Sequence, residues 1–183
     1  MITTKRLFII ISLFFALTSI TAEETWHLTA REAFEKIQEQ GDAILFLDVR
    51  DPVEIKFIGF TDMVDLNIPF RLVKREAWIP ESGSFAMPLN PDFINQVKRA
   101  VKEKGLDDTA TIITMCRSGS ARGKPSAKLL RENGFPNSYY VLHGFQGDPL
   151  PEGNLKQFRL LNGWQNSGLP WSLSANPDKI YKP

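Results

Sequence analysis

The 183-residue chain has very few of the side chains that bind metal ions or form disulfides. It contains one cysteine, Cys116, and two histidines, His27 and His143. A single thiol excludes a disulfide within the chain, and it also excludes any mechanism that needs a second cysteine from the same chain. Three scattered cysteine and histidine residues are too few for an ordinary zinc site. We therefore expect neither a metal nor another cofactor.

The chain also lacks the glycine-rich signatures of nucleotide binding. It has no Walker phosphate loop and no dinucleotide fingerprint, and the Ser118-Gly119-Ser120 segment lacks the framing residues of a serine hydrolase elbow. An excess of charge of one sign is missing too, since the formal net charge is +1. This balance gives no reason to expect nucleic acid or an anionic membrane as a partner.

Long apolar runs are absent except at the N-terminus. A basic pair at residues 5–6 precedes an apolar segment over 7–20, and small residues allow cleavage after Ala22. This pattern predicts a secretory signal peptide over residues 1–22, followed by one periplasmic or secreted domain over 23–183. A membrane-spanning helix needs about 20 apolar residues. An uncleaved anchor is therefore the alternative, and no stable membrane insertion is expected after cleavage.

Strand and helix signals alternate along the rest of the chain. Near-continuous apolar runs predict buried strands over residues 43–47, 111–115 and 139–142. Amphipathic segments with start and stop signals predict helices over residues 29–41, 91–103 and 125–134. The alternation predicts an α/β fold: a three-layer sandwich with a central, mostly parallel sheet flanked by helices. Functional sites in such folds lie at the carboxyl ends of the strands.

The predicted strand over 111–115 leads into Cys116 and a short loop of small and basic residues, Arg117-Ser118-Gly119-Ser120-Ala121-Arg122. A thiol reacts as its thiolate, and the two arginines and the start of the next helix favour that anion. Gly119 permits a positive φ, and the small serines leave backbone N–H groups open to a bound anion. We predict a nucleophilic cysteine in an anion cradle. The alternative is an inert cysteine buried at a strand end.

These residues resemble the active-site loop of the rhodanese-like sulfurtransferases, in which Cys is followed by Arg, a small residue and Gly, and Arg closes the loop. Other segments resemble the family in the same order, namely 47–54, 67–69, 141–144 and 163–170. The resemblance covers roughly residues 26–170 and implies the rhodanese fold. It also implies that Cys116 is catalytic and that substrate is bound by Arg117, Ser118, Gly119, Ser120, Ala121 and Arg122.

Asp48, Arg50 and His143 are interpreted as accessory to this loop. For Asp48 and Arg50, together with Glu54, we favour a charge network that ties one strand end to the neighbouring loop. General acid–base chemistry is the alternative. His143 follows the last predicted strand, and it is either a proton donor that also orients substrate or a histidine of a surface turn.

Three functions are consistent with this reading. The main hypothesis is a sulfurtransferase, in which Cys116 takes sulfur from a small anionic donor such as thiosulfate and passes it from a persulfide to a thiol or cyanide. Five residues separate Cys116 from Arg122, one more than the usual family loop. This is the spacing of phosphatase and arsenate reductase members, so that chemistry is an alternative. The third hypothesis is a non-catalytic sulfur carrier that binds a redox or sulfur-metabolism protein.

Two segments are longer than the family fold requires. Residues 71–91 have no clear period and carry Trp78 and Phe85, and residues 148–162 are polar and contain proline and glycine. Long connections of this kind often form lids or binding loops. We predict that the two insertions line the substrate entrance or bind a partner. For the aromatic residues of 71–91, the alternative is that they only cover the domain core. The tail after Pro170 is expected to pack against the body.

Overall fold

A computed structural model describes residues 26–183, and the predicted signal peptide over 1–22 lies outside them. The elements, in chain order, are β1 (His27–Leu28), α1 (Ala30–Gln40), η1 (Gly41–Ala43), β2 (Ile44–Asp48), α2 (Pro52–Ile58), β3 (Leu66–Asn67), β4 (Lys74–Ile79), β5 (Ser84–Ala86), α3 (Phe93–Glu103), β6 (Thr111–Met115), α4 (Gly123–Glu132), β7 (Ser138–Val141), β8 (Asp148–Pro149), β9 (Arg159–Leu161) and α5 (Gly163–Asn166). Within this range, no helix has the length and apolar character needed to cross a membrane.

A five-stranded sheet in the order β1-β7-β6-β2-β3 forms the centre of the domain. All of its strand pairs are parallel. The carboxyl ends of the strands therefore lie at one edge of the sheet. The predicted strand over 111–115 is confirmed as β6. The strands predicted over 43–47 and 139–142 are each displaced by one residue, to 44–48 and 138–141.

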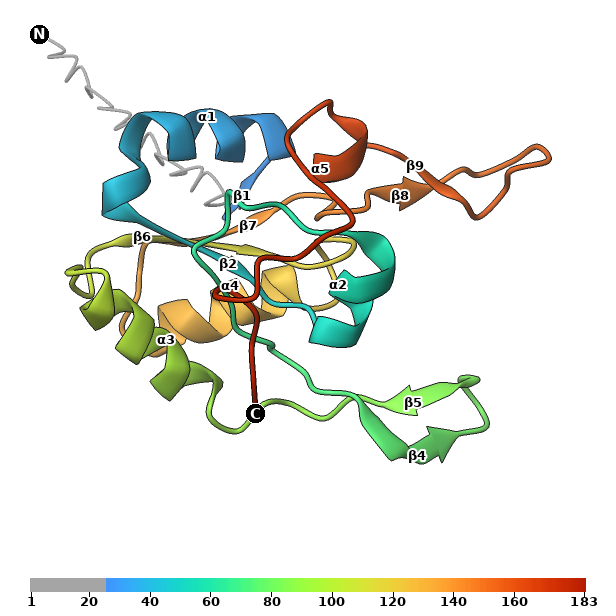
Figure 1. Cartoon of the computed structure of the whole chain (residues 1–183), viewed down its shortest axis with the longest axis horizontal. Coiled ribbons are helices and arrows are strands. Elements are labelled where there is room, and N and C mark those ends of the chain that lie inside the picture. The colour runs from blue at the N-terminus through green and yellow to red at the C-terminus, as the bar shows by residue number, and fades with distance from the viewer. Residues whose placement is uncertain (1–25) are drawn as a thin grey trace, which may run out of the picture.

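Helices cover both faces of the sheet (Figure 1), with α1 and α5 on one face and α3 and α4 on the other. Successive side chains of β2 alternate between the two cores. Ile44 and Phe46 pack on the α1 side, whereas Leu45 and Leu47 pack on the α3 side. Every residue of β2 is buried, because a strand between two helical layers has no solvent face. The predicted three-layer α/β sandwich is confirmed.

Side-chain caps stabilise the first turns of α1, which precedes β2, and of α2, which follows it. The predicted capping box at Thr29 is present at the start of α1. Asp51 caps α2 by accepting a hydrogen bond from the Val53 N–H at 2.9 Å. Its second carboxylate oxygen accepts from the Val73 N–H at 2.8 Å. Asp51 therefore stabilises the start of α2 and also holds the chain that leads into β4.

The two insertions form β-hairpins, whereas residues 71–91 were predicted as a connection without regular structure. β4 and β5 pair antiparallel, with Trp78 opposite Phe85, and β8 and β9 form a second antiparallel pair. Both hairpins project from the same side of the domain, and α2 lies between them (Figure 1). Most residues of β4 are exposed. A strand without a buried face does not alternate between apolar and polar residues, so the sequence pattern did not predict it.

The tail after Pro170 packs against the body, as predicted. Ser172 and Phe60 exchange backbone hydrogen bonds, each 2.8 Å long. The Asn67 N–H donates to the Lys179 carbonyl at 2.7 Å, and the Tyr181 N–H donates to the Asn67 side-chain oxygen at 3.3 Å. Because Asn67 lies on the edge strand β3, the tail satisfies hydrogen-bonding groups that an open sheet edge would expose.

Candidate active site

Cys116 lies at the carboxyl end of β6, as predicted, and its side chain is fully buried, which is the burial expected for the alternative of a cysteine buried at a strand end. It belongs to the apolar cluster on the α3 and α4 side of the sheet. The turn after β7 holds Cys116 and the start of the loop over residues 117–122. The Phe145 N–H donates to the Cys116 carbonyl at 2.8 Å, and the Gln146 N–H donates to the Arg117 carbonyl at 2.9 Å. The position of the sulfur is therefore set by two elements that are distant in sequence.

The sulfur of Cys116 lies against the first turn of α4. A Cβ added at Gly123 would be only 3.6 Å from Sγ, and the Thr114 hydroxyl donates to the Gly123 carbonyl at 3.1 Å. Helix N-termini carry unpaired N–H groups and a partial positive charge, which stabilise a thiolate. α4 begins at Gly123, two residues before the predicted start. Pro125 is accommodated because the first turn needs no N–H at that position.

The reactive loop, residues 117–122, keeps its backbone N–H groups available. In the part of the chain that the structure describes, none of these N–H groups has an acceptor, and the first donor after them is the Lys124 N–H, which bonds the Gly119 carbonyl at 2.8 Å. Gly119 has φ +80°, the positive value predicted for it. A run of unpaired N–H groups around a turn is an anion-binding feature of protein backbones.

Arg122 closes the loop and pairs with Glu54 in the first turn of α2. Its Nη2 donates to Glu54 Oε1 at 2.7 Å, and Nη1 donates to Oε2. Burial alone would lower the pKa of Arg122, but the hydrogen bonds and charge of Glu54, with a smaller contribution from Cys116, raise it above its ordinary value. Arg122 therefore stays positively charged and interacts electrostatically with Cys116.

Arg117 extends toward the β8–β9 hairpin. Its Nε donates to the Gln146 side-chain oxygen at 2.6 Å. Burial lowers the pKa of Arg117, and so does the positive charge of Arg159. Glu54 raises the pKa of Arg117, whereas Arg122 and Arg50 lower it further. The two loop arginines thus have different partners: Arg122 pairs with Glu54, and Arg117 bonds Gln146.

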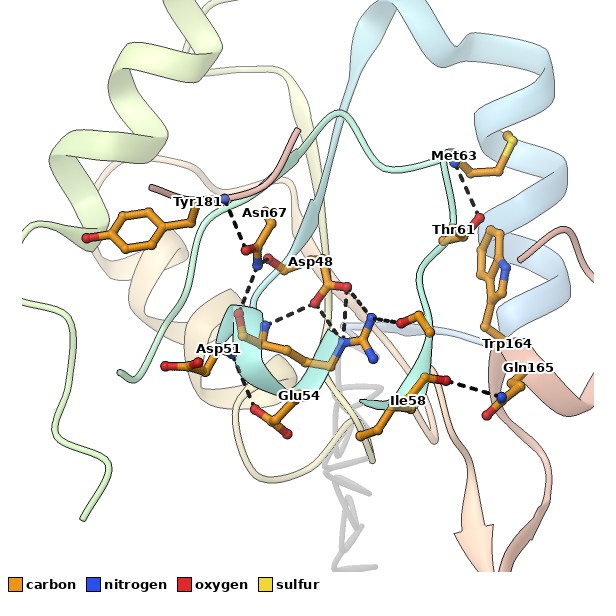
Figure 2. A network of polar contacts seen from close by, with 12 residues as sticks. Asp48, Asp51, Glu54, Ile58, Thr61, Met63, Asn67, Trp164, Gln165 and Tyr181 are labelled. Carbon is orange, nitrogen blue, oxygen red and sulfur yellow. Dashed lines mark hydrogen bonds and ion pairs between the residues drawn. The ribbon is translucent and has the colours of Figure 1, made fainter. Parts of the chain in front are cut away.

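Asp48 and Arg50 form a fully buried ion pair behind the loop. Arg50 donates to both carboxylate oxygens of Asp48 and, at 3.0 Å, to the Gly59 carbonyl. Its guanidinium lies over the Phe145 ring, 4.3 Å from the centroid. The Asn67 amide donates to the backbone carbonyls of both members of the pair (Figure 2). These contacts match the network interpretation, because they connect the end of β2 to three neighbouring segments.

His143 and Gly144 form the turn that packs on the reactive loop. His143 has a positive φ of 63°, and its Nδ1 lies 2.5 Å from Asp148 Oδ2. A Cβ added at Gly144 would be 2.2 Å from the Cys116 carbonyl oxygen, so no larger residue fits there without moving the loop. The role of His143 as a proton donor stays a prediction.

Gln146, Lys156 and Arg159 were not identified from the sequence, although they lie around Arg117. The sequence signal that could have identified two of them is the occurrence of two basic residues, Lys156 and Arg159, within the 148–162 insertion. Among residues 26–183, no group of three or more His, Cys, Asp and Glu side chains is placed to hold a metal ion.

Comparisons with known proteins identify the family. The rhodanese-like domain model matches residues 30–147. The solved structure of Rv0390 from M. tuberculosis is 22% identical, with 81% of this chain and 97% of that chain covered and a TM-score of 0.58. A rhodanese-related protein from Thermoplasma volcanium is 21% identical, with 82% and 98% covered and a TM-score of 0.44. A polysulfide-sulfur transferase homodimer from Wolinella succinogenes is 26% identical, with 66% and 69% covered and a TM-score of 0.40. No curated protein matches the chain.

The family match includes β6, Cys116, the whole reactive loop and α4. The parallel sheet with helices on both faces agrees with it, and the likeness to the M. tuberculosis structure is one of fold. Because the match extends over more than half of the residues, this chain belongs to the rhodanese-like domain family.

Proposed function

We propose that the protein is a sulfurtransferase in which Cys116 is the catalytic residue and carries the sulfur as a persulfide. The observation that carries this proposal is the run of backbone N–H groups over 117–122 that have no acceptor within the described residues. These groups follow the nucleophile directly, and α4 begins immediately after them. Oriented N–H groups of this kind stabilise negative charge that develops on a reacting atom.

In the first step, the Cys116 thiolate attacks the outer sulfur of thiosulfate. A new S–S bond forms to Cys116, the S–S bond of thiosulfate breaks, and sulfite leaves with the electron pair. The persulfide keeps one negative charge on its outer sulfur, which the loop N–H groups and Arg122 stabilise. In the second step a thiolate or cyanide attacks that outer sulfur, and Cys116 leaves as the thiolate.

The Cys116 side chain is fully buried, so any donor must reach it through the loop, and a small donor meets less obstruction than a bulky one. A persulfide places its outer sulfur about 2 Å beyond the cysteine sulfur, so the atom attacked in the second step lies farther from the backbone than the thiol does. A donor with a terminal sulfur atom also reaches a recessed nucleophile more easily than an aryl phosphate does. Because the five-residue spacing between Cys116 and Arg122 is the basis of the phosphatase alternative, the test also measures hydrolysis of an aryl phosphate.

The test is the intact mass of the purified protein after incubation with thiosulfate. We expect a gain of one sulfur atom, which cyanide removes as thiocyanate. The Cys116→Ser variant should show neither the mass gain nor thiocyanate formation. If the wild-type protein forms no adduct and no thiocyanate, or if it instead hydrolyses p-nitrophenyl phosphate in a Cys116-dependent manner, the sulfurtransferase proposal is wrong.

A second candidate function is delivery of the sulfur to a protein of redox or sulfur metabolism. It is favoured by the large apolar side chains that both hairpins expose, among them Trp78 at 56% and Phe158 at 61% exposure. Exposed apolar residues concentrated on neighbouring projections are typical of protein-binding surfaces. A carrier would form the persulfide readily and transfer it slowly to small acceptors. Rapid turnover with small thiols would argue against this second function.

Export to the periplasm or outside the cell is part of the proposal. It is supported by the charged and apolar segments over residues 5–20 and the small residues before Glu23. Expression in a bacterium with the natural N-terminus should yield a mature protein that begins at Glu23, as measured by intact mass. A protein that retains Met1 and stays in the cytoplasm would contradict export.

A further inference from the structure

A cavity of about 330 Å³ lies between the reactive loop and the β8–β9 hairpin. Its lining consists of Arg117, Gln146, Lys156, Gln157, Phe158 and Arg159. Three of these side chains are cationic and none is a carboxylate. The cavity lies outside the cradle formed by residues 117–122, yet Arg117 belongs to both because it follows Cys116 directly.

No carboxylate of the described residues forms an ion pair with the positive charges in this cavity, which are those of Arg117, Lys156 and Arg159. Burial and the charge of Arg159 both lower the pKa of Arg117; Glu54 opposes this, but Glu54 is itself paired with Arg122. Two guanidinium groups that repel one another and lack a counter-charge favour the binding of an anion.

The size of the cavity distinguishes the kind of anion. A volume of about 330 Å³ is at the lower end of the range of small-molecule pockets and larger than an inorganic oxyanion requires. Gln146, Gln157 and Phe158 add neutral hydrogen-bonding and apolar surface between the charges. These features fit an organic molecule that carries carboxylates. The inorganic sulfur donor would instead bind the N–H groups of the loop over residues 117–122.

We propose that this cavity is the acceptor subsite, and that the acceptor is a low-molecular-weight thiol with two carboxylate groups. The inference rests on the proposed sulfurtransferase function and assigns the substrate class of its second step. One carboxylate binds Arg117 and the other binds Arg159 and Lys156. Arg117 belongs to the loop that follows Cys116 and also lines the cavity, so a carboxylate bound there lies beside that loop.

The chemical step balances without an oxidant or reductant. The acceptor thiolate attacks the outer sulfur of the Cys116 persulfide, and an S–S bond forms between the acceptor sulfur and that atom. The bond between the outer sulfur and Cys116 breaks, and its electron pair stays on Cys116 as a thiolate. The outer sulfur keeps its negative charge and leaves with the product, which is the anionic persulfide of the acceptor.

The first experiment measures binding and does not depend on catalysis. S-methylglutathione carries two carboxylates and no free thiol, and its affinity for the purified protein is measured by calorimetry. We expect Arg159→Gln to weaken binding about tenfold, as expected for loss of a hydrogen-bonded charge, and Arg159→Lys to recover part of the loss. Arg99→Gln, which removes an exposed arginine on α3, is the matched control and should bind as the wild-type protein does. No binding by the wild-type protein, or equal binding by Arg159→Gln, overturns the subsite.

The second experiment compares sulfur transfer from the preformed persulfide to glutathione and to 2-mercaptoethanol, which has no carboxylate. Arg159→Gln should lower the ratio of kcat/KM for glutathione to that for 2-mercaptoethanol about tenfold, and Arg99→Gln should leave the ratio unchanged. If the persulfide forms but the ratio does not change, the subsite is wrong and the sulfurtransferase function stands. If no persulfide forms, the function is wrong, and the calorimetry still decides whether the cavity binds carboxylates.

Discussion

The guanidinium of Arg122 and the carboxylate of Glu54 face each other in a two-pronged ion pair, with Nη2 donating to Oε1 at 2.7 Å and Nη1 donating to Oε2. Glu54 also accepts a hydrogen bond from the Asp51 N–H at the start of α2. The last residue of the reactive loop is therefore attached to the first turn of a helix that is 68 positions away in sequence. This attachment holds the positive charge of Arg122 near Cys116.

Glu54→Gln should destabilise the protein by about 2 kcal/mol, because a hydrogen-bonded ion pair is replaced by a weaker neutral contact to a mostly buried arginine. It should also slow persulfide formation, since Arg122 loses the partner that orients it. Denaturant unfolding and the mass-based assay measure the two effects. Glu132→Gln removes a carboxylate from an exposed pair on α4 and serves as the control. Exposed pairs contribute at most about 1 kcal/mol, so equal effects of the two substitutions would contradict the role of Glu54.

The same ion pair should make stability depend on pH in the acid range. Burial alone would raise the pKa of Glu54, but the hydrogen bonds and charge of Arg122 outweigh burial and hold the pKa below its ordinary value. In the unfolded chain the pKa returns to about 4.3. The contribution of Glu54 is therefore fully present above that pH and is lost as the pH falls through the lower pKa of the folded state.

Unfolding free energies measured from about pH 7 to pH 3 should show this linkage. The difference between the wild-type protein and Glu54→Gln should be constant above about pH 5 and should shrink below about pH 4. Other carboxylates with lowered pKa values, such as Asp92 and Asp107, are present in both proteins and cancel in the difference. A difference that does not change with pH would contradict the assignment.

Gly144→Ala should disrupt the reactive loop. Gly144 has φ +61°, and a Cβ there would lie 2.2 Å from the Cys116 carbonyl oxygen and 2.6 Å from the Gly119 nitrogen. Both atoms belong to the backbone, which cannot move without changing the cradle. We expect loss of persulfide formation together with a large loss of stability, measured by intact mass and by thermal unfolding.

The matched control for this substitution is Gly153→Ala, in the turn of the β8–β9 hairpin. Gly153 has φ +83°, but a Cβ there would have no atom within 4 Å. It therefore carries only the cost of a left-handed backbone, about 1 to 2 kcal/mol. Persulfide formation should persist in this variant. Similar losses of activity in the two variants would show that backbone strain, and not contact with the loop, explains the effect.

Asp48→Ala should destabilise the protein by about 3 to 5 kcal/mol, because it leaves the Arg50 charge buried and without its partner. Arg50 Nη1 already lacks an acceptor among the described residues, so the side chain has little further compensation. The double variant Asp48→Leu with Arg50→Met removes both charges and should be less destabilised than the single variant. Denaturant unfolding of the three proteins measures the difference. A double variant that is at least as unstable as Asp48→Ala would show that packing, and not the unpaired charge, determines the cost.

Local patterns in the sequence were sufficient for the sheet and the reactive loop. The apolar run before Cys116 predicts β6, Thr29 and Glu32 predict the start of α1, and Gly119 predicts a positive φ. Each of these features depends on neighbouring residues, because burial on both faces, helix capping and left-handed turns are set within a few positions. The family resemblance was carried by the same local motifs.

The site itself was decided by contacts between distant segments. Only the folded chain pairs Arg122 with Glu54, places Arg117 beside Arg159 and closes the apolar core over Cys116. The exposed hairpins also lacked a sequence signal, because a strand without a buried face carries no hydrophobic period. The sequence alone therefore predicted the candidate nucleophile and determined which elements hold it. Which charges face that nucleophile, and which face a ligand, depends on the three-dimensional arrangement, because electrostatic interactions follow distance in space and not separation along the chain.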